Sequence, residues 1–97
     1  MDYLKVIVVG NTTKDAEVKA AKSGSNYADF VLAYSKADNP AIYFPVRVFG
    51  KQAQNCEMLK KGDKVLVEGG LEISEYDDQE GKKRVSVRIL ADTYRKL

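Results

Sequence analysis

The sequence predicts an all-β chain folded as a small antiparallel barrel of five strands with one short helix. Apolar and polar side chains alternate with period two in several separate runs, as they do in half-buried strands. Short clusters of Gly, Ser, Asn, Asp and Pro separate these runs, which is typical of hairpin connections. Three strands, a helix and two more strands follow one another with no long crossover, which argues against a parallel sheet.

The first two strands are expected at Tyr3 to Val9 and at Tyr27 to Tyr34. Between them, Asn11 to Ala21 is a weaker extended stretch that is compatible with a continuation of the first strand. The turn residues Lys22 to Asn26 then lead into the second strand.

The third strand, Ile42 to Phe49, has the clearest alternation. One face of it is apolar and is expected to face the core: Ile42, Phe44, Val46 and Val48. The other face carries two aromatic rings on either side of an arginine: Tyr43, Pro45, Arg47 and Phe49. An outward strand face normally carries Thr, Ser, Lys or Glu, so these aromatic rings require an explanation.

A short helix is expected over Gln52 to Lys61. Ala53, Cys56 and Leu59 recur at a spacing of three, and Gly62 is a typical C-terminal stop. This helix lies between the third and fourth strands.

The last two strands are expected at Lys64 to Tyr76 and at Lys83 to Leu90, joined by the turn Asp77 to Gly81. Glycine inside a strand marks a bulge or a sharp bend, so Gly69-Gly70 predicts a turn of the barrel wall. The inward side chains are expected to be Val65, Val67, Leu71, Ile73, Val85, Val87 and Ile89. The outward ones are Glu68, Glu72, Ser74, Tyr76, Arg84, Ser86 and Arg88.

Composition limits both the architecture and the chemistry. The 97 residues, with a formal charge of +2, are expected to form one domain over residues 1–97. There is no histidine, which removes the commonest general base and metal ligand, so we expect no enzyme, no metal and no cofactor. The single Cys56 is expected to be buried, and neither a secretory signal nor a membrane span is apparent. These features favour a reducing compartment, the cytoplasm.

This order of elements is that of the OB-fold, a five-stranded Greek-key barrel with a helix between strands three and four. The chain also resembles bacterial single-stranded DNA-binding proteins along nearly its whole length. The strings that carry the resemblance are Val6–Asn11, Lys14–Lys19, Ser23–Gly24, Phe30–Ala33, Val46–Lys51, Leu59–Gly69 and Tyr76–Lys82.

The resemblance implies an OB-fold, usually a homotetramer, that binds single-stranded DNA without sequence preference and without catalysis. It also implies roles in replication, recombination and repair, where an acidic C-terminal tail recruits partner proteins. The sequence ends at Tyr94-Arg95-Lys96-Leu97 without such a tail, so recruitment of those proteins is left open. A loop aromatic of the family is replaced by Asp38, and its tryptophans by Tyr43 and Tyr76.

The outward aromatics suit the stacking of unpaired bases. Tyr43 and Phe49 lie on one strand face, about 20 Å apart, with Arg47 between them. Tyr76 ends the outward face of the fourth strand and is a third candidate. Tyr34 is a fourth, although its phase suits a core position at the barrel mouth equally well. The alternative for all of these rings is a subunit interface or a small cluster under a loop.

Cations in outward positions are candidate phosphate contacts. They are Arg47, Lys51, Arg84, Arg88 and Lys5. The alternative is that these side chains are solvated or protect a sheet edge.

The first strand favours self-association. Val6 and Val8 are directed to the core, which leaves Ile7 and Val9 exposed on the opposite phase. An apolar strand edge in water is a pairing hazard, so we expect at least a dimer, and a tetramer by resemblance.

Two other functions remain open. One is a primosome-type or other protein-interaction module in which the aromatics contact a protein and DNA binding is secondary. The other is a nuclease, for which Glu68 and Glu72 are the only outward acids available to hold a metal. The adjacent Asp77 and Asp78 are expected to form a hydrated turn.

Overall fold

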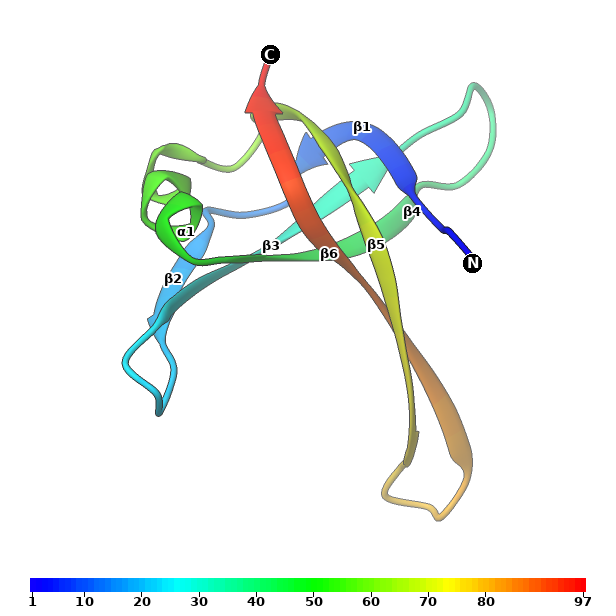
Figure 1. The fold of residues 1–97 in the computed structure, drawn as a ribbon. Helices are drawn as coiled ribbons and strands as arrows, with labels where there is room; N and C mark the ends of the chain where they lie inside the picture. The colour runs from blue at the N-terminus through cyan, green and yellow to red at the C-terminus, as the bar shows by residue number, and fades with distance from the viewer.

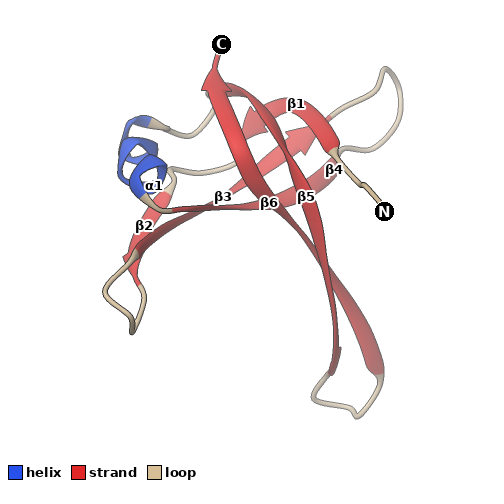
Figure 2. Ribbon diagram, viewed as in Figure 1, coloured by secondary structure: helices blue, strands red, loops and turns tan.

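Six strands and one short helical segment make up the fold, and the computed structural model describes residues 1–97 (Figure 1). The strands are β1 (Val6–Thr12), β2 (Glu17–Ala20), β3 (Asn26–Tyr34), β4 (Ile42–Phe49), β5 (Lys64–Asp77) and β6 (Lys83–Lys96). The helix α1 (Lys51–Asn55) continues into a 3-10 turn, η1 (Cys56–Met58), between β4 and β5 (Figure 2). Neither helix is long and apolar enough to cross a bilayer.

Five of the strands close into a ring, in the order β1-β5-β6-β4-β3. The ring closes where β1 pairs with β3 at Asn11↔Ala33 and Thr12↔Leu32, and β2 is added outside the ring on β3. The predicted all-β barrel, with its helix between the strands now labelled β4 and β5, is therefore confirmed. One pairing differs from the antiparallel expectation, because β4 and β6 run parallel over Val46–Val48. The chain passes through α1 and β5 between these two strands, so it can return in the same direction.

The predicted strand boundaries hold best where alternation is strict. The strand β4 has the predicted bounds, and β5 and β6 start at the predicted residues, with β6 continuing to Lys96. The first strand starts at Val6 rather than Tyr3 and ends at Thr12. The stretch after it forms a separate strand, β2, which pairs with β3 instead of continuing β1.

A buried threonine explains where β1 ends. The Thr12 hydroxyl donates to the Lys60 carbonyl at 2.6 Å and accepts the Asp63 N–H at 3.0 Å. The Thr12 N–H also donates to the Asp63 carbonyl at 2.8 Å. These bonds join the end of β1 to the turn before β5 and satisfy a polar group that is only 3% exposed.

The helix is shorter than predicted. The Leu59 N–H donates to the Cys56 carbonyl at 2.9 Å, which closes the 3-10 turn, and Leu59 itself has an extended backbone. This extension lets the Leu59 side chain enter the core, where it is fully buried, so the helical geometry cannot continue to Lys61.

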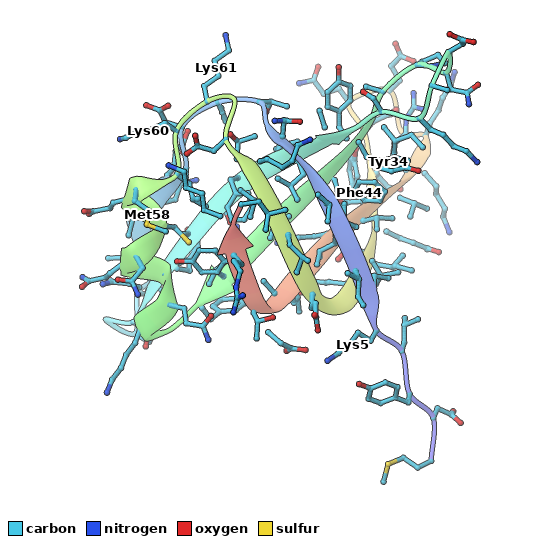
Figure 3. All side chains as sticks on the ribbon, turned by 90° about the horizontal axis from the view of Figure 1, so that it is seen from above. Lys5, Tyr34, Phe44, Met58, Lys60 and Lys61 are labelled. Atoms are coloured by element: carbon cyan, nitrogen blue, oxygen red, sulfur yellow. The ribbon has the colours of Figure 1, made fainter.

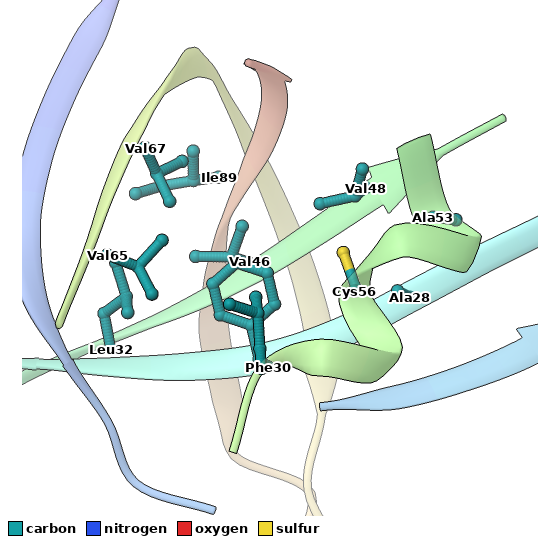
Figure 4. Close-up of a cluster of buried hydrophobic side chains, with 11 residues drawn as sticks. Ala28, Phe30, Leu32, Val46, Val48, Ala53, Cys56, Val65, Val67 and Ile89 are labelled. Carbon is teal, nitrogen blue, oxygen red and sulfur yellow. The ribbon is translucent and has the colours of Figure 1, made fainter. Parts of the chain in front are cut away.

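The core fills the ring beneath α1 (Figure 4). Its buried side chains are Ala28, Phe30, Leu32, Val46, Val48, Ala53, Cys56, Leu59, Val65, Val67 and Ile89. Most of them come from the inward phases of β3, β4 and β5, and those of β4 and β5 were predicted to face inward. Cys56 is buried, as expected.

The bend predicted at Gly69-Gly70 is confirmed. The β5–β6 register shifts between Glu68 and Gly69, which marks a bulge. A Cβ atom at Gly69 would lie 2.0 Å from the Leu90 carbonyl oxygen, whereas one at Gly70 would meet nothing within 4 Å. Glycine at position 69 therefore permits the close approach of β6 that bends the wall.

Beyond this bend the β5–β6 hairpin continues past the barrel as a projecting arm, defined here as residues 72–88 (Figure 1). Ile73 and Val85 are 63% and 62% exposed, and Val87 is 40% exposed. The prediction that these three side chains are buried is wrong. They do share one face with the buried Ile89, but the barrel ends before it reaches them. Ile42, on the inward phase of β4, is likewise 53% exposed.

Candidate nucleic-acid interface

The outer face of β4 carries exposed aromatic rings. Tyr43 and Phe49 stand at the two ends of this strand and are 62% and 56% exposed. The alternation of β4 places them opposite the buried Val46 and Val48, so they cannot turn into the core. The predicted exposure of both rings is confirmed.

The register between β3 and β4 adds Tyr27, which sequence reasoning missed. Tyr27 is the cross-strand partner of Phe49, and their ring centroids are 6.3 Å apart at a tilt of 44°. The Arg47 guanidinium lies 4.5 Å from the centroid of the Tyr27 ring, within cation–π range. The parity of Tyr27, opposite to that of Tyr34 on the same strand, was the available signal.

Arg47 does not lie free between the two rings. It is the cross-strand partner of Asp29 and donates two hydrogen bonds to that carboxylate, at 2.7 Å from Nε and 2.9 Å from Nη2. Burial acts to raise the pKa of Asp29, but the hydrogen bonds and charge of Arg47, together with the charges of Lys19 and Arg88, hold the pKa below its ordinary value. The same pair raises the pKa of Arg47.

Tyr76 and Arg84 are partners near the tip of the projecting arm. In the continuous register from Gly70↔Leu90 onward, both lie on the same side of the sheet as Arg47, whose partner is Leu90. Tyr76 is 52% exposed, and its ring pairs with neither Tyr43 nor Phe49.

Asp78 organises the turn at the tip of the arm. Its Oδ1 accepts the N–H groups of Glu80 and Lys82, each at 2.9 Å, and its Oδ2 accepts Arg84 Nε at 2.9 Å. The Arg84 hydrogen bond, followed by the backbone donors, lowers the pKa of the Asp78 carboxyl. Asp78 is thus a structural acceptor in the turn, rather than part of a merely hydrated pair with Asp77.

The other predicted cations differ in their partners. Arg88 Nη1 lies 3.2 Å from Glu72 Oε1, and Lys5 Nζ lies 3.8 Å from Glu68 Oε2. Lys5 precedes β1 (Figure 3), while Lys51 is exposed at the start of α1 and belongs to no ion pair. Three of the predicted phosphate contacts, Arg47, Arg84 and Arg88, are therefore already bonded to carboxylates.

Tyr34 lies apart from the other rings, on the inward phase at the barrel mouth (Figure 3). Its ring meets Phe44 edge-on at 6.5 Å, and both line a wholly apolar hollow of about 240 Å³ with Ile7, Val8 and Val9. This setting differs from the outer face of β4, where exposed aromatic rings flank a charged arginine.

Groups suited to catalysis do not converge on this face. No three His, Cys, Asp or Glu side chains gather to hold a metal ion. Burial raises the pKa of the Cys56 thiol, and Glu68 and Glu72 each face a basic partner. The arrangement can instead present flat aromatic surfaces beside cations, which is what stacking of unpaired rings needs.

Comparisons with known proteins agree with this geometry. Residues 3–97 match the model of the single-strand binding protein family. The chain is 36% identical to the single-stranded DNA-binding proteins of Helicobacter hepaticus and Wolinella succinogenes, in alignments that cover 98% of this chain and 61% and 64% of those proteins. It is 32% identical to single-stranded DNA-binding protein 1 of Staphylococcus aureus, over 92% of this chain and 62% of that protein. The chain thus spans about three fifths of the length of these relatives. It belongs to the single-strand binding protein family.

Proposed function

We propose that the chain binds single-stranded DNA without sequence preference and without catalysis, and thereby protects it during replication, recombination and repair. Bases stack on Tyr43, Phe49 and Tyr76, and phosphates are held by nearby Lys and Arg side chains. The observation that carries the proposal is the outer face of β4, which exposes two aromatic rings in a chain of this family.

The magnitudes support useful affinity. Stacking contributes roughly 1–3 kcal/mol per base, so three such rings supply roughly 3–9 kcal/mol, which reaches micromolar binding at the upper end before any charge effect. Phosphate contacts add a dependence on salt, with a slope of about −0.7 for each phosphate neutralised on a single strand.

A titration with an unstructured oligothymidine, followed by tyrosine fluorescence, tests the proposal. We expect quenching at micromolar protein, with an affinity that falls as salt rises. A chain that shows no quenching would not bind DNA in this way, and the protein-interaction module would become the better explanation. A binding constant that does not change with salt would contradict the phosphate contacts.

Self-association belongs to the same proposal. Ile7 and Val9 on β1 are 62% and 41% exposed, and β1 pairs with β3 only at Asn11 and Thr12. The backbone edge of β1 is therefore open over its apolar half, which favours pairing with a second copy. We propose at least a dimer, and a tetramer in line with the family resemblance. A light-scattering mass equal to one chain at micromolar concentration would contradict it.

The proposed setting is the cytoplasm. A lone, fully buried cysteine is compatible with a reducing compartment. Expression with a fluorescent tag followed by cell fractionation would test this location directly.

A further inference from the structure

The strongest feature that the proposed function leaves unused is the ion pair between Asp29 and Arg47. Charged residues in the middle of an outer face usually point to solvent, yet the two side chains here are only 27% and 23% exposed. Two hydrogen bonds of 2.7 and 2.9 Å fix the guanidinium in a bidentate geometry. A planar group held in this way has little freedom to follow a moving ligand.

The pair lies directly beside the aromatic rings. Arg47 covers the Tyr27 ring at 4.5 Å, and the Tyr27 ring contacts Phe49 at 6.3 Å. Arg47, Tyr27 and Phe49 thus form one continuous group, which we call the Arg47 stack. Guanidinium planes and aromatic rings are both surfaces on which nucleobases stack.

The carboxylates beside the Arg47 stack are shared by three cations. Lys19 Nζ lies 3.6 Å from Asp29 and 3.4 Å from Glu17, and Lys14 Nζ lies 3.4 Å from Glu17. Arg47 makes the shortest contacts to Asp29, at 2.7 and 2.9 Å, so its charge is already engaged there. A phosphate that approached Arg47 would have to displace Asp29 or lie beside its negative charge. Because Arg47 then neutralises no phosphate, it releases no counterion from the DNA and should add nothing to the salt dependence of binding.

Cations without a carboxylate partner lie at the nearby end of the sheet. Lys51 comes two residues after Phe49, and Lys22 lies in the turn that leads into β3; both are exposed and belong to no ion pair. The two segments meet because the Gly50 N–H donates to the Asn26 carbonyl at 3.1 Å. Phosphates can be neutralised there without breaking an existing pair.

We infer that Asp29 is a positioning residue for DNA binding: it holds Arg47 flat in the Arg47 stack and withholds its charge from phosphates. Bases then lie over Arg47, Tyr27 and Phe49, while the backbone runs toward Lys22 and Lys51. This inference rests on the proposed single-stranded DNA binding.

The test measures how oligothymidine affinity changes with salt for the whole chain and two variants. Asp29→Asn removes the carboxylate charge and frees Arg47 to neutralise a phosphate. Glu57→Gln is the matched control, because it makes the same change in net charge at an exposed, unpaired position on η1. We expect the salt slope of Asp29→Asn to steepen by about 0.7, which is about a fivefold larger loss of affinity over a tenfold rise in salt. The slope of Glu57→Gln should match that of the unchanged chain.

Two further variants separate positioning from a purely structural role. Asp29→Glu keeps the charge and should restore the original slope. The double variant Asp29→Asn/Arg47→Gln replaces the pair by two amides without changing the net charge, and it keeps the test usable if Asp29→Asn alone unfolds. Its slope should equal that of the unchanged chain.

The outcomes are distinct. If the unchanged chain does not bind the oligonucleotide, the proposed function fails and this inference fails with it. If the chain binds and Asp29→Asn has the same slope as Glu57→Gln, only the inference is overturned. A slope that becomes shallower by about 0.7 in the double variant would also overturn it, because Arg47 would then have been a phosphate contact.

Discussion

Truncating the exposed rings of β4 tests the base-stacking surface directly. Phe49→Ala and Tyr43→Ala each remove one ring and leave several tyrosines as fluorescent probes. Stacking is worth roughly 1–3 kcal/mol per base, so each change should weaken oligothymidine binding about 5- to 150-fold. The two rings stand at opposite ends of the strand, so the losses should be nearly additive in the double variant.

The expected loss of stability is smaller. More than half of the Phe49 side chain is already in water, since it is 56% exposed. Fully burying a Phe side chain contributes about 1.5–3 kcal/mol, so the part that is buried here contributes roughly 1 kcal/mol, including contact with Tyr27. The variants should therefore remain folded, which circular dichroism and a thermal melt would verify.

Ile42→Ala is the matched control for these two variants. Ile42 is adjacent to Tyr43 and is similarly exposed, at 53%, but it lies on the inward phase of β4. Its truncation should leave affinity within about twofold, well below the smallest stacking loss. If Ile42→Ala weakened binding as much as Tyr43→Ala, or if Phe49→Ala did not change the affinity, the stacking surface would have been assigned to the wrong side of the sheet.

Three further predictions concern the fold. Gly69→Ala should lower the free energy of unfolding by about 1–3 kcal/mol or more, because its Cβ would clash with the backbone oxygen of Leu90. The control Gly70→Ala should lower it far less, since a Cβ there meets nothing within 4 Å. Urea denaturation of the two variants compares these losses. Because the pKa of Asp29 is lowered, the folded state binds fewer protons than the unfolded state while this carboxyl titrates. The stability that the Asp29 carboxylate contributes is therefore complete above the unfolded pKa of about 4, and it is lost as the pH falls through the folded pKa. Asp29→Asn should therefore flatten the acid side of a pH–stability curve, and an unchanged slope there would contradict the effect of Arg47 on this carboxyl. Cys56 should react with iodoacetamide only as fast as the protein opens, because the thiol is buried and its pKa is raised; rapid labelling without denaturant would contradict this.

The sequence was sufficient to predict the barrel and the exposed rings of β4. Strict alternation from Ile42 to Phe49 fixes which side chains share a face, and the buried Val46 and Val48 then leave Tyr43 and Phe49 outside. The helix position was likewise predictable, because helical spacing interrupts the period-two pattern between two strands.

The extent of burial was less predictable. Alternation correctly groups Ile73 with Val85 and Val87, but it does not show how far the barrel reaches along the hairpin. Whether an apolar side chain is covered depends on elements distant in sequence, and none of them covers the projecting arm.

The pairs of side chains that meet within the site could not be predicted without the register between β3 and β4. Tyr27 meets Phe49, and Asp29 meets Arg47, only because β3 and β4 pair at those positions. An aspartate in the middle of a predicted strand is an unusual residue there, and this was the one hint that Arg47 had a partner.

The three proposed stacking rings differ in how rigidly the fold holds them, because Tyr76 lies on the projecting arm and the other two lie on the barrel. A two-stranded ribbon without a third layer is only marginally stable, so amide exchange should be fast near Tyr76 and slow along β4. Tyr43 and Phe49 would then hold bases at fixed positions on the barrel, whereas Tyr76 would move with the flexible tip of the hairpin. This combination of two rigid rings and one flexible ring would allow one molecule to bind single-stranded DNA of differing curvature with little loss of free energy.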